Sequence, residues 1–180
     1  MSTEIAPLIT TSRLVLRPLT ESDSQDVFEY SQNPQVGPNA GWKPHETLEE
    51  TISIMQAVFL NRDAVWGICR KDIPAVIGSL GLIDDPKRPD NPSVRMLGYA
   101  LGRPFWGIGI MSEAVAAVCQ YGFDSLGLQA ISAYTFPFNE RSKSVLKKNG
   151  FQYEGRLKMV EYSWDQKELL DNDCYLLLRK

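Results

Sequence analysis

The chain has 180 residues, of which 43% are hydrophobic and 23% charged, and it is long enough for one compact domain with a hydrophobic core. These proportions exclude collagen, a coiled coil and extensive disorder. The net charge of −3 provides no overall basic field, which argues against nucleic acid or an anionic membrane as a partner.

The cysteine and histidine contents argue against a metal site. Cys69, Cys119 and Cys174 are far apart in the sequence, and His45 is the only histidine. Each cysteine lies in an apolar run, which is typical of a buried thiol in a reducing compartment. The N-terminus has no signal-peptide pattern, and no apolar run approaches the ~18 residues of a membrane span. We therefore expect a cytoplasmic protein without a metal and without a membrane partner.

The pattern of apolar residues predicts strands and helices mixed along the chain. Thr47 and Glu50 have the spacing of a capping box at the start of a helix, and Gly150 stands where a helix would end. In chain order we expect a strand at 13–19, a helix from Thr20 to before Pro34, a helix from about His45 to Phe59, strands at 64–70, 75–83 and 94–101, a helix at 108–123, a strand at 129–136, a helix at 139–149 and strands at 151–161 and 169–178. This order, βααβββαβαββ, contains no repeat and no linker, and it predicts one mixed α+β domain over residues 1–180.

Residues 97–114 join a strand, a Gly-x-Gly turn and a helix directly. Gly107 and Gly109 allow a tight turn without a Cβ, so that unpaired N–H groups at the helix start can point at one anion. Gly-x-Gly also occurs as an ordinary turn. Ser112 occupies the third glycine position of a dinucleotide-binding fingerprint, and no nucleotide-binding P-loop is present. By itself the segment is a candidate pyrophosphate site.

Residues 138–151 by themselves predict an amphipathic helix. Asn139 is a suitable N-cap, Val145 and Leu146 face the core, and Lys143 belongs to a basic face.

Considered together, the two segments carry matching motifs, W-G-x-G-x-x-[ST]-E-A from Trp106 and N-x-x-S-x-x-V-L-x-K-x-G-F from Asn139. The segment W-K-P-H-E-T-L-E-E-T from Trp42 supports them. The chain in this respect resembles the GNAT (Gcn5-related) N-acetyltransferases, and most of all their ribosomal-protein N-terminal acetyltransferase branch, over about residues 13–179. The resemblance implies an α+β fold with a central, mostly antiparallel mixed sheet of about seven strands flanked by about four helices. It also implies a splayed V between the fourth and fifth strands, 94–101 and 129–136.

The same resemblance implies that acetyl-CoA is a co-substrate bound in this V. Residues 106–111 would wrap the pyrophosphate, the backbone of 97–100 would hold the pantetheine arm and polarise the thioester, and Asn139 would reach the cofactor from the other side. The implied cofactor-binding residues are Leu97, Gly98, Tyr99, Ala100, Arg103, Trp106, Gly107, Ile108, Gly109, Ile110, Met111, Asn139, Ser142 and Lys143.

The resembling branch also suggests catalytic and acceptor-binding residues. Glu161 takes the place of a proposed general base, and Ser142 the place of a group that hydrogen bonds to the departing sulfur. The alternatives are a solvated strand carboxylate and a helix-surface hydroxyl. Trp42 and His45 lie on the loop that the family places beside the acceptor, although a packing tryptophan and a capping or rim histidine would explain them equally.

Two positions depart from the family pattern. The family's phosphate loop usually has Arg or Gln three residues before the first glycine, where this chain has Pro104, so that Arg103 or backbone amides must serve. The tyrosine that many members place seven residues after the asparagine is Leu146 here.

The sequence therefore supports an N-acetyltransferase that moves acetyl from acetyl-CoA to a primary amine in a ternary complex. No cysteine lies in either motif, which argues against an acetyl-enzyme. The acceptor is a protein N-terminal α-amine, as in the ribosomal-protein branch, or a small amine, and the protein is a monomer or homodimer. The alternative is a non-catalytic acyl-CoA-binding or regulatory module. A different nucleotide-binding fold is disfavoured by the three successive strands from 64 to 101.

Overall fold

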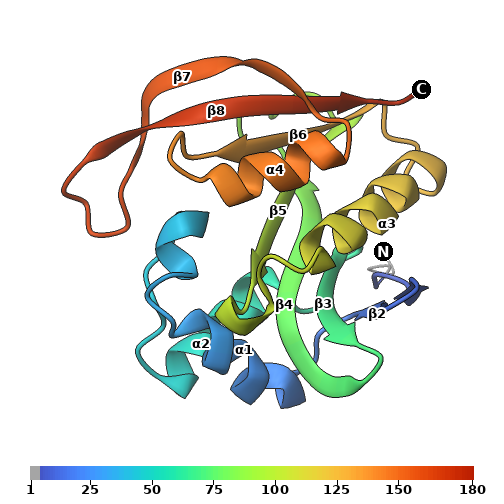
Figure 1. Cartoon of the computed structure of the whole chain (residues 1–180), viewed down its shortest axis with the longest axis vertical. Coiled ribbons are helices and arrows are strands. Elements are labelled where there is room, and N and C mark those ends of the chain that lie inside the picture. Colours follow the sequence, from blue (N-terminus) through green and yellow to red (C-terminus); the bar gives the residue numbers. More distant parts are fainter. Residues whose placement is uncertain (1–4) are drawn as a thin grey trace. The chain divides into compact units, whose positions relative to one another are not determined.

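A computed structural model describes residues 5–180 of the chain. Three short 3-10 helices lie at Glu21–Asp23, Gly37–Ala40 and Arg103–Phe105. The helices and strands, in chain order, are β1 (Ile9–Thr10), β2 (Leu14–Arg17), α1 (Ser24–Ser31), α2 (Leu48–Val58), β3 (Val65–Arg70), β4 (Ile73–Asp84), β5 (Val94–Leu101), α3 (Ile110–Asp124), β6 (Ala130–Thr135), α4 (Glu140–Lys148), β7 (Gln152–Tyr162) and β8 (Leu169–Leu178) (Figure 1).

The strands form a mixed sheet in the order β1-β2-β3-β4-β5-β6-β8-β7. Strands β5 and β6 are parallel, whereas β1–β2, β2–β3, β3–β4, β6–β8 and β7–β8 are antiparallel. The predicted α+β class and mostly antiparallel sheet are confirmed. The sheet has eight strands because the two residues of β1, too few to show a pattern in the sequence, pair with β2. The third helix begins at Ile110, two residues later than expected.

The chain divides into two compact units, which we describe separately. The first contains the residues up to Gly81 together with Tyr99–Ile110, and the second contains Leu82–Gly98 together with Met111–Lys180.

The first unit is held by a core between α1, α2 and the strands. Its buried residues are Leu19, Val27, Tyr30, Val36, Met55, Cys69 and Val76. Thr47 caps α2 by accepting a hydrogen bond from the Glu50 amide at 3.1 Å. The expected capping box is incomplete, because the Glu50 carboxylate accepts from the Glu46 amide instead of the Thr47 amide.

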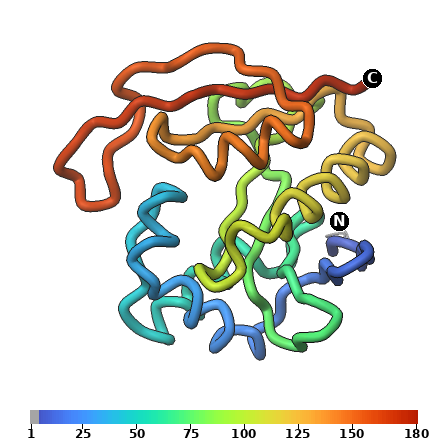
Figure 2. The backbone as a smooth tube through the Cα atoms, in the orientation of Figure 1, coloured from blue at the N-terminus to red at the C-terminus, as the bar shows by residue number. Residues whose placement is uncertain are grey.

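The second unit packs α3 and α4 with β6, β8 and β7. The buried side of α3 carries Ala114, Val115, Val118 and Cys119, as its helical periodicity predicts. A Cβ at Gly122 would lie 2.8 Å from Leu82, so glycine allows α3 to approach β4 closely. The β7–β8 hairpin, orange to red in Figure 2, continues beyond β6, whose last residue pairs with Asp173.

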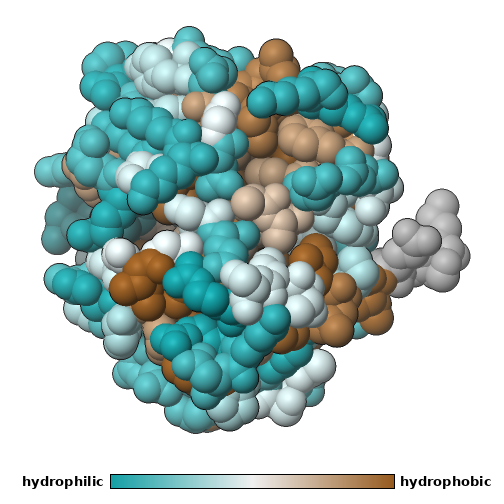
Figure 3. All heavy atoms as spheres, turned by 45° about the vertical axis from the view of Figure 1, so that its right-hand side comes forward, coloured by the Kyte–Doolittle hydropathy of each residue, from teal (hydrophilic) through white to brown (hydrophobic). Residues whose placement is uncertain are grey.

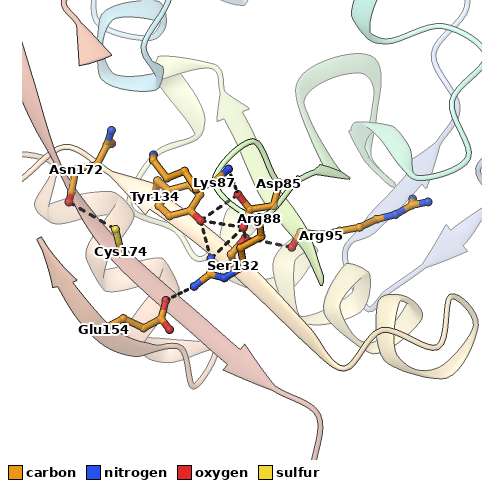
Figure 4. A network of polar contacts seen from close by, with 9 residues as sticks. All are labelled: Asp85, Lys87, Arg88, Arg95, Ser132, Tyr134, Glu154, Asn172 and Cys174. Atoms are coloured by element: carbon orange, nitrogen blue, oxygen red, sulfur yellow. Dashed lines mark hydrogen bonds and ion pairs between the residues drawn. The ribbon is translucent and has the colours of Figure 1, made fainter. Parts of the chain in front are cut away.

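A buried carboxylate, Asp85, anchors the turn after β4 in the second unit (Figure 4). It accepts hydrogen bonds from Ser132 Oγ at 2.7 Å and from Tyr134 Oη at 2.8 Å, and it forms an ion pair with Arg88 at 3.0 Å. Arg88 also forms an ion pair with Glu154 of β7 at 2.8 Å. Burial acts to raise the pKa of Asp85, but these hydrogen bonds outweigh it and leave the pKa lowered. The turn between β4 and β5 is therefore fixed to β6 and β7.

Hydrophilic side chains cover most of the face in Figure 3, and hydrophobic ones gather in separate patches. Among residues 5–180, no helix combines the length and the apolar composition needed to cross a membrane.

Candidate active site

The Gly-x-Gly turn has the backbone that the sequence predicted for it. Gly107 and Gly109 have φ angles of +79° and +81°, in the left-handed region that favours glycine. No atom lies within 4 Å of a Cβ built on Gly107. Residues 107–109 are exposed, and α3 starts at Ile110 with N–H groups that have no partner inside the helix. Because the side chains of Ile110 and Met111 are buried, they offer a ligand only their backbone.

Two arginines of the first unit lie at this turn. Arg13 Nη1 donates to the Ile108 carbonyl at 2.9 Å, and Nη2 lies 3.4 Å from the position of a Gly109 Cβ. The Arg103 guanidinium lies 4.9 Å from the Trp106 ring centre and donates to Gln35 Oε1 at 2.9 Å. Sequence reasoning had identified Arg103 and missed Arg13, which is separated from the turn by 95 residues.

Trp42 and His45 lie together in the first unit, with ring centroids 5.2 Å apart. His45 is buried, and its Nδ1 lies 2.9 Å from Thr51 Oγ1. Because the Thr51 hydroxyl donates to the Thr47 carbonyl, it accepts from a protonated Nδ1. Burial lowers the pKa of His45, which favours the neutral imidazole. The His45 side chain therefore lies inside the first unit, where it is hydrogen bonded to Thr51 of α2.

The parallel pairing of β5 and β6 ends at Leu97 and Ala133, although β5 continues to Leu101 and β6 to Thr135. This end of pairing is the expected splay. Gly98 follows it with open space where a Cβ would stand. The Thr135 hydroxyl is buried and has no hydrogen-bond partner, which is uncommon because buried polar groups are nearly always satisfied.

The start of α4 holds three predicted residues. Asn139 is the N-cap, and its Oδ1 accepts from the Ser142 amide at 3.1 Å. Lys143 Nζ lies 2.9 Å from Glu140 Oε1 and 3.3 Å from Asp173 Oδ2. The hydrogen bond that Lys143 donates to Glu140 is the main cause that raises the pKa of Lys143. Its ammonium group is therefore already compensated by two carboxylates.

Glu161, the predicted base, is half-buried on β7. Its Oε2 accepts a hydrogen bond from Asn172 Nδ2 of β8 at 2.9 Å. Asn172 is buried, and sequence reasoning had not identified it. No sequence pattern could have paired these residues, because a break in the strand register brings them together.

The three cysteines are buried free thiols. Burial raises the pKa of Cys119 to about 12 and also raises those of Cys69 and Cys174, so none is activated as a nucleophile. Within residues 5–180, no cluster of His, Cys, Asp and Glu side chains is arranged to hold a metal.

Comparisons with known proteins agree on one family. The family model described as "Acetyltransferase (GNAT) domain" matches residues 13–152. The uncharacterized N-acetyltransferase YoaA of Bacillus subtilis is 32% identical, over 96% of this chain and 97% of its own length. The [ribosomal protein uS5]-alanine N-acetyltransferase of Escherichia coli is 34% identical over a shorter region, 38% of this chain and 37% of its own.

A similar solved structure is that of the acetyltransferase (GNAT family) from Bacillus anthracis. It has a TM-score of 0.82 and 22% sequence identity, over 96% of this chain and 98% of that one. This similarity establishes the fold.

Proposed function

We propose that this chain, which belongs to the acetyltransferase (GNAT) family, transfers acetyl from acetyl-CoA to a primary amine by direct attack in a ternary complex. GNAT enzymes are transferases that act with acetyl-CoA. The observation that carries the proposal is the exposed Gly107–Gly109 turn leading directly into α3, with Arg13 beside it. We leave both acceptor classes open, a protein N-terminal α-amine and a small-molecule amine, and we place the reaction in the cytoplasm, where free thiols persist.

The residues present fit acetyl-CoA. An anion at the turn would meet backbone N–H groups, the positive end of the α3 dipole and the guanidinium of Arg13 or Arg103. The unpartnered Thr135 hydroxyl provides a polar atom at the end of β6 that a bound group would satisfy. We propose the cofactor contacts in three segments of the chain, Leu97–Ala100, Arg103 with Trp106–Met111, and Asn139 with Ser142 and Lys143. Lys143 would need to release one of its ion pairs to reach a phosphate.

Amide formation requires a neutral amine and a protonated leaving group. Acetyl-CoA supplies the activated thioester. An α-amine is on the order of a tenth unprotonated at pH 7, whereas a lysine amine is free only about once in 2,500. Glu161 Oε1 would take one proton from the acceptor ammonium, and the neutral nitrogen would then attack the thioester carbon as the C–S bond breaks. The second proton of the nitrogen would pass to the departing thiolate, to which the Ser142 hydroxyl would donate a hydrogen bond.

The test is to incubate the protein with acetyl-CoA and a panel of amines, including N-terminal peptides, polyamines and amino acids, and to follow thiol release. We expect acceptor-dependent release with at least one amine class and a mass increase of one acetyl group on that acceptor. Tight CoA binding without turnover across the panel would reject the enzyme and favour the acyl-CoA-binding module.

Replacing Arg13 by alanine should raise the Kd for CoA about tenfold, because a charge-assisted contact to phosphate is lost. Isothermal titration with CoA, dephospho-CoA and pantetheine measures the effect. The loss should appear with both nucleotides and be absent with pantetheine, which has no pyrophosphate. Arg62→Ala is the matched control, since Arg62 also donates to a backbone carbonyl, that of Ala57. An Arg13→Ala protein that binds CoA as tightly as the parent would remove Arg13 from the site.

A further inference from the structure

The β7–β8 hairpin compensates its buried or half-buried acids with cations, except at Glu161. Lys158 forms an ion pair with Asp171 at 2.8 Å, Lys167 with Asp165 at 3.0 Å, and Arg156 with Asp173 at 2.6 Å. Glu161 is also half-buried, but it accepts its hydrogen bond from the neutral amide of Asn172. Its negative charge is therefore left for an incoming cation.

A break in the strand register brings Asn172 within reach of Glu161. Leu157 pairs with Asn172 and Glu161 pairs with Leu170, so four steps along β7 match two steps along β8. In a regular ladder Glu161 would pair with residue 168, roughly 13 Å along the strand from Asn172. The bulge moves it two positions closer, to the diagonal neighbour distance of about 7–8 Å that long side chains span.

The bulge is held by contacts that involve neither Glu161 nor Asn172. Met159 has a φ angle of +52°, a strained backbone for a residue with a side chain. Its amide donates to Asp171 Oδ1 at 3.0 Å, while Lys158 holds the other oxygen of Asp171. The fold thus maintains backbone strain at the point that sets the position of Glu161.

The hydrogen bond also determines which carboxylate oxygen is available. An ionised carboxylate only accepts, so Asn172 turns its NH₂ group toward Oε2. Buried Asn172 fixes this oxygen and leaves Oε1 for the acceptor. An amide at this place orients the carboxylate and leaves its negative charge in place, whereas a lysine or arginine would neutralise that charge.

We infer that Asn172 is a positioning residue for acetyl transfer, which orients Glu161 as an uncompensated base toward the acceptor ammonium. The inference rests on the proposed function with Glu161 as base. It extends the site to a buried residue of β8 and assigns a role to the bulge at Leu157–Glu161.

The test measures kcat, KM and pH profiles for Asn172→Ala, Asn172→Asp, Glu161→Gln and the double variant Glu161→Gln/Asn172→Ala. Asn172→Ala should lower kcat about tenfold and change the KM for acetyl-CoA less than twofold. On the Glu161→Gln background it should cause no further loss, because the two residues act as a unit. Asn91→Ala, which changes an exposed asparagine in the β4–β5 turn, should match the parent.

Asn172→Asp keeps the shape of the side chain, so it tests the positioning role even if the alanine variant does not fold. The second carboxylate disfavours ionised Glu161, so the acidic limb of the kcat/KM profile should move by about one pH unit to higher pH. If Asn172 has only a structural role, the substitution should change stability and leave the acidic limb of the profile where it is. An unshifted acidic limb would therefore overturn the inference.

The outcomes separate the inference from the proposed function. The positioning role of Asn172 fails if Glu161→Gln is inactive while Asn172→Ala is fully active. It also fails if the decrease in kcat of the double variant is the product of the two single decreases. In both cases the assignment of Glu161 as the base is kept. If Glu161→Gln is as active as the parent, the base assignment fails and the positioning role fails with it.

Discussion

Replacing Glu161 by glutamine is expected to lower kcat for acetyl transfer by about 100-fold, because an amide cannot take a proton from the acceptor. The Kd for CoA should stay within twofold, since we assign no cofactor contact to this side chain. Steady-state kinetics and isothermal titration on one preparation measure both quantities.

The pH dependence of the same variant gives a second readout. Without the base, the reaction depends on amine that is already neutral in solution. With an N-terminal peptide as acceptor, kcat/KM should therefore rise roughly tenfold per pH unit below about pH 7.7. Glu168→Gln, an exposed glutamate of the same hairpin, is the matched control and should resemble the parent. Parent-like turnover in Glu161→Gln would exclude Glu161 from the mechanism.

Replacing Asp85 by alanine is expected to lower the free energy of unfolding by about 2–4 kcal/mol. The variant leaves Tyr134 and the Lys87 amide without their acceptor inside the second unit and removes the shorter of the two hydrogen bonds of Ser132. It also removes one ion pair of Arg88. Urea denaturation at pH 7 measures the loss. Asp84→Ala changes the exposed neighbouring aspartate and should alter the free energy by less than about 0.5 kcal/mol.

The same network predicts an acid dependence of stability. The pKa of Asp85 is lower in the folded protein than in the unfolded chain. Its contribution is thus fully present above the unfolded value of about 3.9 and is lost as the pH falls through the folded value. Asp85→Ala should lose less stability than the parent between pH 5 and pH 2. An equal loss in both proteins would show that Asp85 is not a source of the acid sensitivity.

The hydrogen bonds and ion pairs of the turn after β4 also fix strands of the proposed site. Asp85 bonds to Ser132 and Tyr134 of β6, on either side of Ala133, where the pairing with β5 ends. Through Arg88 the network also reaches Glu154 on the strand that carries Glu161. The polar network around Asp85 in Figure 4 therefore holds β6, which carries Thr135, and β7, which carries Glu161.

The sequence by itself determined the order of elements, the mixed α+β class and the glycine turn, because these depend on local properties. Gly107 and Gly109 adopt the positive φ angles that glycine favours, and Asn139 caps α4 through the short-range bond to Ser142. The motifs around them also identified the family. Such features depend on residues close together in the sequence, so they can be predicted without the tertiary structure.

Only the tertiary structure decided which distant side chains meet. Arg13 reaches Ile108 across 95 residues, Asp85 reaches Tyr134 across 49, and Lys143 meets Asp173 rather than lying on an open basic face. Asn172 meets Glu161 because a bulge shifts the register, and no propensity or periodicity specifies how far one strand slips against its neighbour. The candidate base was named from a resemblance, whereas the residue that orients it follows from strand pairing alone.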